Sequence, residues 1–430
     1  MTPTPFQLFS TLIFALSIVH VFFTPTIFKA ALALQKKQKH HEWQVTIETL
    51  LLLSEIELVF GLWLIPLFGG YALFYSWSES LGYLTSRDYT EALYMVVIVL
   101  IVSASPLITF GEKVLEKIAR LGKDSPTSWW WVILCLGPLS SMLLKEPGAM
   151  ALLAVLLGRK FYHFRPSNAF KYVTLALLFL NVALSGLLSS FSSRSLYLLT
   201  SKRELSTYYM LRTFGWKALL GILLITSVAY LVFRKEFRKF PGRVPALERG
   251  ERKKVPLWVT LGHLLFAASV AYVGNQGPLL VLLGLCFLGF YKITAIYQHT
   301  HVIKQAFFVG FFFAALLILG ELQGWWIREI FPHLEALGTE VATLILSAFI
   351  DNAVVIYLVP DIFSLTDPRF YAAVVGSIAA GGLTVIANVP NPIGYTLLSP
   401  YFKRKISGIG LFTAALIPTL LIFLLFWALG

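Results

Sequence analysis

The stretch LGTEVATLILSAFIDNAVVIYLVP, residues 337–360, decides the fold. It is apolar over a length suited to a membrane segment, yet Asp351 and Asn352 interrupt it in the middle. Acidic residues match or outnumber basic ones on both flanks, with Glu329 and Glu335 before the stretch, Asp361 and Asp367 after it, and Arg328 and Arg369 as the basic residues. Since cytoplasmic loops carry an excess of Lys and Arg, both ends are predicted to lie outside. The stretch is therefore predicted to be a re-entrant hairpin that enters from the outside.

A second interrupted apolar segment, residues 128–157, has flanks of the opposite character. Basic residues precede and follow it: Lys113, Lys117, Arg120, Lys123, Arg159, Lys160, Arg165 and Lys171. The same rule places both of its ends in the cytoplasm. We predict a second re-entrant hairpin, which enters the membrane from the side opposite to the first.

The composition of the whole chain agrees with a membrane protein. Of 430 residues, 57% are hydrophobic and 13% are charged, against about 25% charged residues in an ordinary soluble domain. Windows of about 20 apolar residues can cross the hydrocarbon core as helices. Ten such spans are predicted at about 6–28, 45–69, 90–110, 172–192, 213–233, 256–274, 278–291, 305–327, 371–392 and 406–429. The sequence predicts an all-α polytopic membrane protein.

The basic segment 234–255 divides the chain into two parts, residues 1–233 and 256–430. It is the strongest cytoplasmic marker in the sequence. With the N-terminus outside, five spans bring the chain to the cytoplasm, so the second part starts from the opposite face and both termini are predicted to be periplasmic. Two inverted repeats, each with a re-entrant hairpin and a broken helix, follow from this count, as in secondary transporters. The basic residues of 193–212 violate the charge rule.

Residues 388–392, Asn-Val-Pro-Asn-Pro, interrupt the span 371–392. Two prolines remove backbone donors and restrict the residues that precede them. The diglycine Gly381-Gly382 lets another helix approach closely, and the oxygens of Thr384, Asn388 and Asn391 could surround a small cation. A break at membrane depth survives only where protein or a water-filled cavity surrounds it. The alternative is a kink that serves packing.

Asp351 is the acidic residue whose position is hardest to explain as structure. An ionised carboxylate at membrane depth costs several kcal/mol unless it is paired, protonated or bound to an ion. A single carboxylate that takes either a proton or Na⁺, but not both, makes binding competitive. Competitive binding is the minimal chemistry of exchange.

Lys145 and Glu146 occupy the corresponding place in the first half. Lys145 is hypothesised to face Asp351 and to take the place of the ion during the proton-loaded step; the alternative is a lysine that snorkels to the cytoplasmic surface. Glu55, in the second span, either lines an access path or serves helix packing through hydrogen bonds. Glu48 and Glu55, seven residues apart, are predicted to share a helix face.

Cofactors and other partners receive no support from the sequence. It contains no phosphate-binding Gly-rich loop followed by Lys and Ser or Thr, and no His or Cys cluster with metal-ligand spacing. The net charge of +13 is spread over loops without a compact basic domain, which disfavours nucleic acid. The expected partners are the lipid bilayer and the transported ions, and the sequence leaves open whether the protein forms a homodimer.

Four motifs resemble the putative Na⁺/H⁺ antiporter family of bacteria, within the ion transporter superfamily. They are Glu55–Trp63, Gly137–Met150, Phe349–Ala353 and Gly381–Pro392. The resemblance implies two opposed re-entrant hairpins, two broken helices and a cation site at their tips. Two departures stand out, because Lys145 replaces an expected small hydroxyl residue and 181–188 lacks the expected glycine and threonine.

Together these observations predict a secondary transporter, not an enzyme, that exchanges Na⁺ for H⁺ across the bacterial inner membrane by alternating access. Asp351 is predicted to be the main ion and proton carrier. The second half-site is completed by Asn352, Thr384, Asn388 and Asn391, with Asp351, Asn352 and Asn388 as the Na⁺ ligands. Glu146 with Ser185 or Ser189 forms the first half-site. The alternatives are a cation-coupled carrier of a small organic anion, such as a dicarboxylate, and a membrane anchor that transports nothing.

Overall fold

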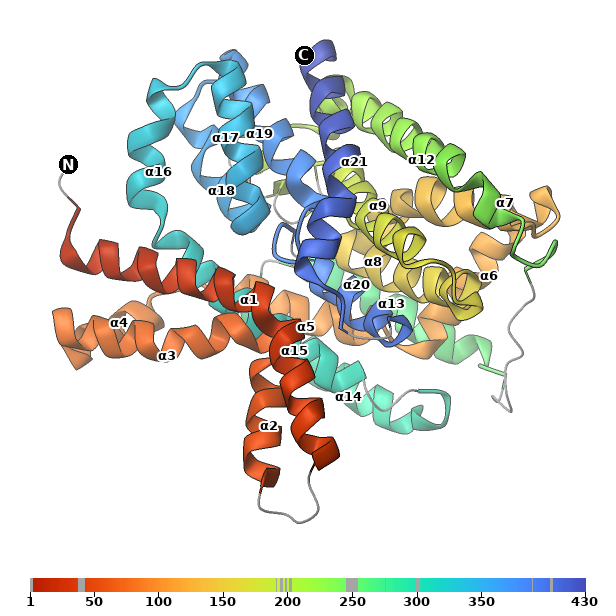
Figure 1. Cartoon of the computed structure of the whole chain (residues 1–430), viewed down its shortest axis with the longest axis horizontal. Coiled ribbons are helices and arrows are strands. Elements are labelled where there is room, and N and C mark those ends of the chain that lie inside the picture. Colours follow the sequence, from red (N-terminus) through yellow and green to blue (C-terminus); the bar gives the residue numbers. More distant parts are fainter. Residues whose placement is uncertain are drawn as a thin grey trace.

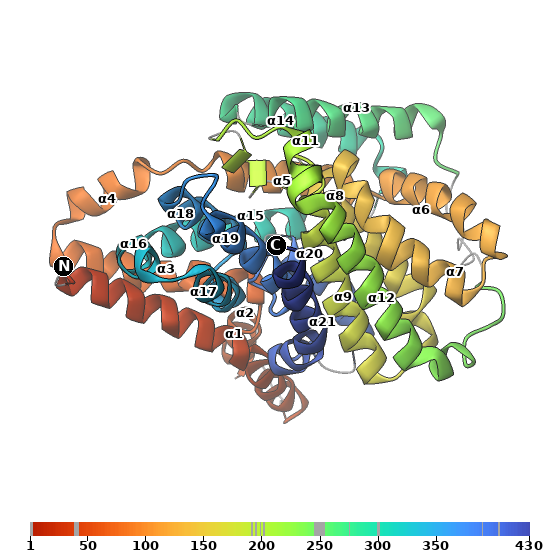
Figure 2. The same ribbon diagram turned by 90° about the horizontal axis from the view of Figure 1, so that it is seen from above.

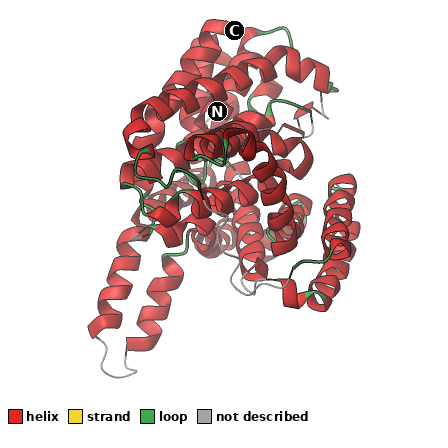
Figure 3. Ribbon diagram, turned by 90° about the vertical axis from the view of Figure 1, so that its right-hand side faces the viewer, coloured by secondary structure: helices red, strands yellow, loops and turns green. Residues whose placement is uncertain are grey.

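The computed structural model describes residues 3–37, 43–190, 192–193, 196–197, 199–200, 203–244, 254–274, 276–298, 302–388, 390–402 and 405–430. These residues form helices and loops and no strand (Figure 3), so the predicted all-α class is confirmed. Parts of the segments used in the prediction lie outside the described ranges: Arg194 and Lys202 of 193–212, Val389 of 388–392, and 245–253 of the linker.

The N-terminal helices form a group at one end of the molecule. They are α1 (Pro5–Lys37), α2 (Gln44–Leu53), α3 (Ile56–Phe74) and α4 (Trp77–Thr85). Helix α1 packs against both α2 and α3 (Figure 1), and the end of α1 protrudes together with α2 from the body of the molecule (Figure 3).

A second group of helices contacts the first group through α3. It contains α5 (Thr90–Val102), α6 (Ser105–Ala119), α13 (Leu257–Val273), α14 (Gly277–Ile293) and α15 (Val302–Glu321). Helix α15 packs against α3 and α5, while α13 and α14 cover α5 along one edge (Figure 2). The predicted halves therefore interleave here, because α5 belongs to the first half and α13 to α15 belong to the second.

The first interrupted segment folds back on itself. The segment begins with α7 (Pro126–Trp131) and continues through a π-helical stretch (Val132–Leu136) and a 3₁₀ turn (Gly137–Ser140) into α8 (Ser141–Lys160), which is kinked at Lys145. Lys160 Nζ lies 4.3 Å from the ring centroid of Trp129, which a continuous helix over these 31 residues could not bring together. The segment predicted at 128–157 is therefore a helical hairpin. It is followed by α9 (Asn168–Gly186), α11 (Thr207–Met210) and α12 (Trp216–Phe237).

The second interrupted segment is followed by the same order of elements. Its helices are α16 (Gly324–Ile330), α17 (Ala336–Phe349), α18 (Asn352–Leu358), α19 (Pro368–Ala379), α20 (Asn391–Leu398) and α21 (Gly408–Leu429). In the first stretch a broken helix pair (the break is at Lys145) is followed by α9, a non-helical stretch and the long apolar helix α12. In the second stretch the broken pair α17 and α18 is followed by α19, a non-helical stretch and, after α20, the long apolar helix α21. This shared order supports the division of the chain into repeats, and their inversion stays a prediction.

Three predicted spans are bent where straight helices were expected. Within the described residues, five helices are long and apolar enough to cross a membrane, and eight are if each bent pair forms one span. The span 45–69 bends by 96° between α2 and α3, and 90–110 bends by 67° between α5 and α6. The span 305–327 bends by 51° between α15 and α16. Glu48 and Glu55 therefore do not share a helix face, since α2 ends at Leu53.

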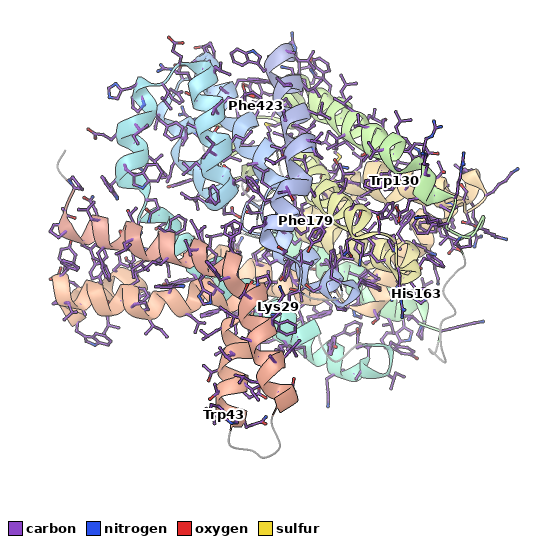
Figure 4. All side chains as sticks on the ribbon, viewed as in Figure 1. Lys29, Trp43, Trp130, His163, Phe179 and Phe423 are labelled. Carbon is purple, nitrogen blue, oxygen red and sulfur yellow. The ribbon has the colours of Figure 1, made fainter. Side chains whose placement is uncertain are left out.

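The interior of the molecule lies between the two hairpin regions. Phe179 on α9 is fully buried and lies near the centre of the molecule (Figure 4). Trp130 of α7 is also fully buried, and its Nε1 donates a 3.3 Å hydrogen bond to the Thr226 carbonyl of α12. The segment 193–212, predicted as an outer loop, contributes Leu196, Leu199 and Leu205 to the core. The described part of this segment is therefore packed on the body through these leucines, while Arg212 at its end is exposed.

Candidate functional site

The break between α17 and α18 holds Asp351 at its centre. Ile350 and Asp351 have extended backbone angles, and α18 begins directly after them. Asp351 Oδ1 accepts a 2.7 Å hydrogen bond from the Ala353 N–H, so the side chain caps α18. The Asn352 N–H donates to the Ala387 carbonyl at 3.2 Å. Asp351 is 1% exposed, and the predicted interruption is therefore a buried break that contacts the second broken helix.

The non-helical stretch between α19 and α20 is held by two of the predicted site residues. Asn391 Nδ2 donates to the carbonyls of Gly381 (2.8 Å) and Thr384 (2.9 Å). Thr384 Oγ1 donates to the Ala348 carbonyl of α17 at 2.6 Å. These bonds satisfy backbone carbonyls that the break releases, as buried polar groups require. Thr384 and Asn391 thus fix the shape of the break through their side-chain donors.

Asn388 differs from Asn391 in its hydrogen bonding. Its side chain is fully buried, and within the described part of the chain neither Oδ1 nor Nδ2 has a hydrogen-bond partner. Leaving such a buried amide unpaired costs about 1–3 kcal/mol. Asn388 follows Ala387, whose carbonyl accepts the Asn352 N–H, so the backbone at Asn388 lies close to the break that holds Asp351. This amide is available to a bound cation or water.

The first hairpin has its own break, at Lys145. The backbone angles there are φ 60° and ψ 168°, a region that residues other than glycine rarely adopt. Glu146 follows and is 2% exposed, and its N–H donates to the Ser192 carbonyl at 3.3 Å. Its Oε1 would lie 2.5 Å from a Cβ placed on Gly186, so only a glycine at the end of α9 leaves room for this carboxylate.

Glu146 and Asp351 lie within electrostatic range of one another, although they come from different halves of the chain. Each is the acidic residue at the break of its helix pair, and both are almost fully buried. Ser193 lies beside the Glu146 carboxylate. The structure thus brings together the two carboxylates that the sequence singled out.

The serines after α9 surround Glu146 in part. The hydroxyls of Ser189 and Ser192 are hydrogen bonded to each other, and the Ser192 N–H donates to Ser189 Oγ at 2.9 Å. Ser185 Oγ instead donates to the Val182 carbonyl (2.7 Å) and lies within hydrogen-bond distance of Ser141 Oγ (2.9 Å). Ser189 therefore belongs to the turn that receives Glu146, whereas Ser185 ties α9 to the start of α8. The sequence reasoning missed Ser192 and Ser193, which precede an interior segment that was expected to be an outer loop.

The two broken helices touch through the diglycine, as predicted. A Cβ on Gly381 would lie 2.5 Å from Ala183 Cβ, and one on Gly382 would lie 2.9 Å from the Ala176 carbonyl oxygen. Both neighbours belong to α9. This contact holds the break after α19 directly against the helix that leads to Gly186 and Glu146.

The remaining predicted residues lie as follows. Lys145 is half-buried at its break, and its proposed pairing with Asp351 stays a prediction. Glu55 lies at the bend between α2 and α3, where its Oε2 accepts a 3.2 Å hydrogen bond from Lys405 Nζ. Its side chain is 42% exposed. The described residues contain no group of three or more His, Cys, Asp or Glu side chains placed to hold a metal ion.

These features define a class: a multi-pass helical membrane protein with a buried polar site where two broken helix pairs meet. A family model described as "Putative Na+/H+ antiporter" matches residues 5–429, and the chain belongs to this family. The resemblance inferred from the four sequence motifs is thus confirmed, and it supports cation/proton antiport at the level of the family. A search among curated proteins finds no match.

Proposed function

We propose that the protein exchanges Na⁺ for H⁺ by alternating access, with Asp351 as the main carrier. The observation that supports this most is the electrostatic proximity of Glu146 and Asp351 in an interior where each is at most 2% exposed. Two ionised carboxylates repel each other there, and the repulsion is relieved by a proton or by a cation between them. Because either cargo satisfies the same site, binding of one excludes the other.

The Na⁺ ligands proposed in the second half-site are the oxygens of Asp351, Asn352 and Asn388. The unpaired amide of Asn388 supports its inclusion, since a buried oxygen without a donor is free to coordinate a cation. Thr384 and Asn391 complete the half-site by holding the break in shape. In the first half-site, Glu146 is supported by Ser189, and Ser185 fixes the adjoining helix.

The cellular setting that we propose is the bacterial inner membrane. The two helix pairs enter from opposite faces, the linker 234–255 lies in the cytoplasm, and both termini lie in the periplasm. The distribution of Lys and Arg supports this orientation. Breaks at membrane depth then meet near the midplane, where a rocking of one repeat against the other exposes the site to each side in turn.

Exchange is tested with purified protein in liposomes that contain a pH dye. Pulses of Na⁺, Li⁺ or K⁺ outside wild-type liposomes are expected to drive protons out of the lumen for at least one of these ions. Asp351→Asn removes the carboxylate that carries both cargoes and is expected to abolish the signal. Glu335→Gln is the matched control, because Glu335 is an exposed carboxylate at the start of α17 and lies outside the site.

Two results would refute the proposal. One is proton movement in Asp351→Asn at the wild-type rate. The other is the absence of proton movement with every alkali cation while Na⁺ gradients drive uptake of a small dicarboxylate. The second result would identify a cation-coupled carrier of organic anions.

A further inference from the structure

Helix α17 carries a polar stripe that leads to Asp351. Glu340, Thr343 and Ser347 are spaced three and four residues apart, so they follow one face of α17, and Asp351 lies in the break that follows the helix. All four are at most 1% exposed. The opposite face carries Leu337, Val341 and Ile345, which are 38–55% exposed as lipid-facing residues are. The helix thus hides its polar face inside the protein.

Helix α19 covers this stripe closely. A Cβ on Gly376 would collide with the Glu340 carbonyl oxygen and with Thr343 Oγ1, so the two helices approach to backbone contact. Thr343 Oγ1 is satisfied by the carbonyls of Thr339 and Glu340 on its own helix. The stripe is therefore enclosed by protein, as polar groups at membrane depth must be.

Two members of the stripe lack the hydrogen bonds that a packing role requires. Within the described residues, Oε1 of Glu340 and Oγ of Ser347 have no hydrogen-bond partner, and no ion pair involves Glu340. A buried carboxylate at membrane depth costs several kcal/mol unless it is paired, protonated or bound to an ion. Helix packing through polar side chains would give hydrogen bonds, so packing leaves Glu340 and Ser347 unexplained.

Two polar side chains from neighbouring helices, Tyr371 and Lys217, lie in the region of Glu340. From α19, Tyr371 lies within electrostatic range of Glu340. The Tyr371 hydroxyl accepts a 3.0 Å hydrogen bond from Lys217 Nζ of α12 and donates to the Phe426 carbonyl of α21 at 3.4 Å. Lys217 is thus held by Tyr371, and among the described residues Oε1 of Glu340 has no hydrogen-bond partner.

The length of the stripe fits half of a membrane. Nine helical steps and two extended residues separate Glu340 from Asp351 along the chain, which corresponds to about 15–20 Å. The hydrocarbon core is about 30 Å thick, so a path of this length joins its centre to one surface. Glu340 then lies close to the face of the membrane at which α17 begins.

We propose that this stripe is the route by which cations and protons travel between that face and Asp351, and that Glu340 is the first binding residue on the route. The proposal rests on the proposed function for the identity of the cargo. Ser347 lies halfway and offers its hydroxyl oxygen to a dehydrated ion. Sodium ions are attracted by the Glu340 carboxylate and then move to the stronger site at Asp351.

The route itself is tested without measuring transport. Cys135 and Cys286 are first replaced by Ala, and single cysteines are then placed at Thr343, Ser347 or the control position Ile345. A small, positively charged methanethiosulfonate reagent is added to right-side-out and to everted membrane vesicles. We expect Thr343→Cys and Ser347→Cys to react from one side about tenfold faster than Ile345→Cys, because a charged reagent does not enter lipid. Excess Na⁺ is expected to slow the reaction at position 347.

The role of Glu340 is tested by exchange kinetics. Glu340→Gln is expected to raise the Na⁺ concentration for half-maximal exchange about tenfold while the maximal rate is kept, because the carboxylate concentrates cations at the mouth of the route. Glu335→Gln, which removes a charge from the exposed start of the same helix, is expected to leave both constants unchanged.

The outcomes separate the two proposals. Equal reactivity at 343, 345 and 347 from both sides overturns the route, even in a protein that exchanges Na⁺ for H⁺. Reactive cysteines with protection by Na⁺ support the route, even if proton exchange is absent and the proposed function fails. Wild-type kinetics in Glu340→Gln overturn the assignment of Glu340.

Discussion

Gly382 packs directly against Leu180: a Cβ on Gly382 would lie 2.9 Å from Leu180 Cβ, and equally close to the carbonyl oxygen of Ala176. The neighbour is helix backbone as well as side chain, so it has little freedom to move away. The contact joins the break after α19 to α9, and α9 ends at the glycine that makes room for Glu146. The close approach of the two half-sites therefore depends on the absence of a side chain at Gly382.

Gly382→Ala is expected to lower the free energy of unfolding by about 1–3 kcal/mol, the usual cost of overpacking a filled interior. The same variant is expected to lose Na⁺/H⁺ exchange, because the two carboxylates are pushed apart. Thermal unfolding in detergent and exchange in liposomes measure the two effects. Gly69→Ala is the control, since a Cβ there meets nothing within 4 Å; a Gly382→Ala protein as stable and active as this control would contradict the expectation.

The sequence predicted the breaks better than the bends. Asp351 interrupts an apolar run, and such a signal is local, so the break there was found where the structure has it. The second break was predicted at 388–392 but begins earlier, since α19 ends at Ala379 and Asn391 and Pro392 already belong to α20. The bend between α2 and α3 has no such local signal. At this bend Lys405 Nζ donates to the Ser54 carbonyl (2.6 Å) and to Glu55. Lys405 is about 350 residues away in the chain, so residues 45–69 alone could not reveal this partner.

Other features were within reach of the sequence. The bend after α5 precedes Pro106, whose restriction of the residue before it was a usable signal. Glu340 was missed, although its spacing of three and seven residues from Thr343 and Ser347 puts it on their helix face. The approach of Ser192 to Glu146 is a tertiary contact between a hairpin and a later turn, and sequence spacing carries no information on it.

Asn388 and Asn391 are expected to respond differently to alanine. Asn391→Ala leaves the carbonyls of Gly381 and Thr384 without their donor and is expected to cost about 1–3 kcal/mol of stability. Asn388→Ala removes a buried amide without partners and is expected not to lower the thermal midpoint in Na⁺-free buffer. It is expected instead to abolish the rise of the midpoint with Na⁺ concentration, because a ligand stabilises the state that binds it.

A melting series with increasing Na⁺ distinguishes these roles, with Asn168→Ala, an exposed residue at the start of α9, as the control. If Asn388→Ala kept the wild-type stabilisation by Na⁺, Asn388 would not be a ligand. If Asn391→Ala melted at the wild-type temperature, the two hydrogen bonds would not support the break.

Glu146 and Asp351 are expected to be energetically coupled. In alkaline, Na⁺-free buffer, Glu146→Gln and Asp351→Asn each remove one of two carboxylates that repel, so each is expected to raise the thermal midpoint. The double variant is expected to gain less than the two single gains added together, with a coupling energy of about 0.5–3 kcal/mol. Additive effects across the four proteins would show that the carboxylates do not sense each other, and would remove the main support for exchange.

The backbone of Lys145 is expected to be strained, and its side chain is expected to contribute to the coupling of Na⁺ and H⁺ movement. Its backbone angles, φ 60° and ψ 168°, are available to glycine without penalty but cost other residues about 1–3 kcal/mol. Lys145→Gly is therefore expected to be more stable than Lys145→Ala by a similar amount, since alanine keeps the strain and both lose the ammonium group. Thermal unfolding of the two variants measures this difference.

Exchange by the same two proteins tests the ammonium group itself. If Lys145 takes the place of the ion during the proton-loaded step, both variants change the pH dependence and the Na⁺:H⁺ stoichiometry in the same way, whatever their stability. Lys145→Arg, which keeps the positive charge, stays closer to the wild type. Wild-type pH dependence and stoichiometry in both the alanine and the glycine variants would leave the lysine with a surface role, because a snorkelling side chain contributes to packing and not to coupling.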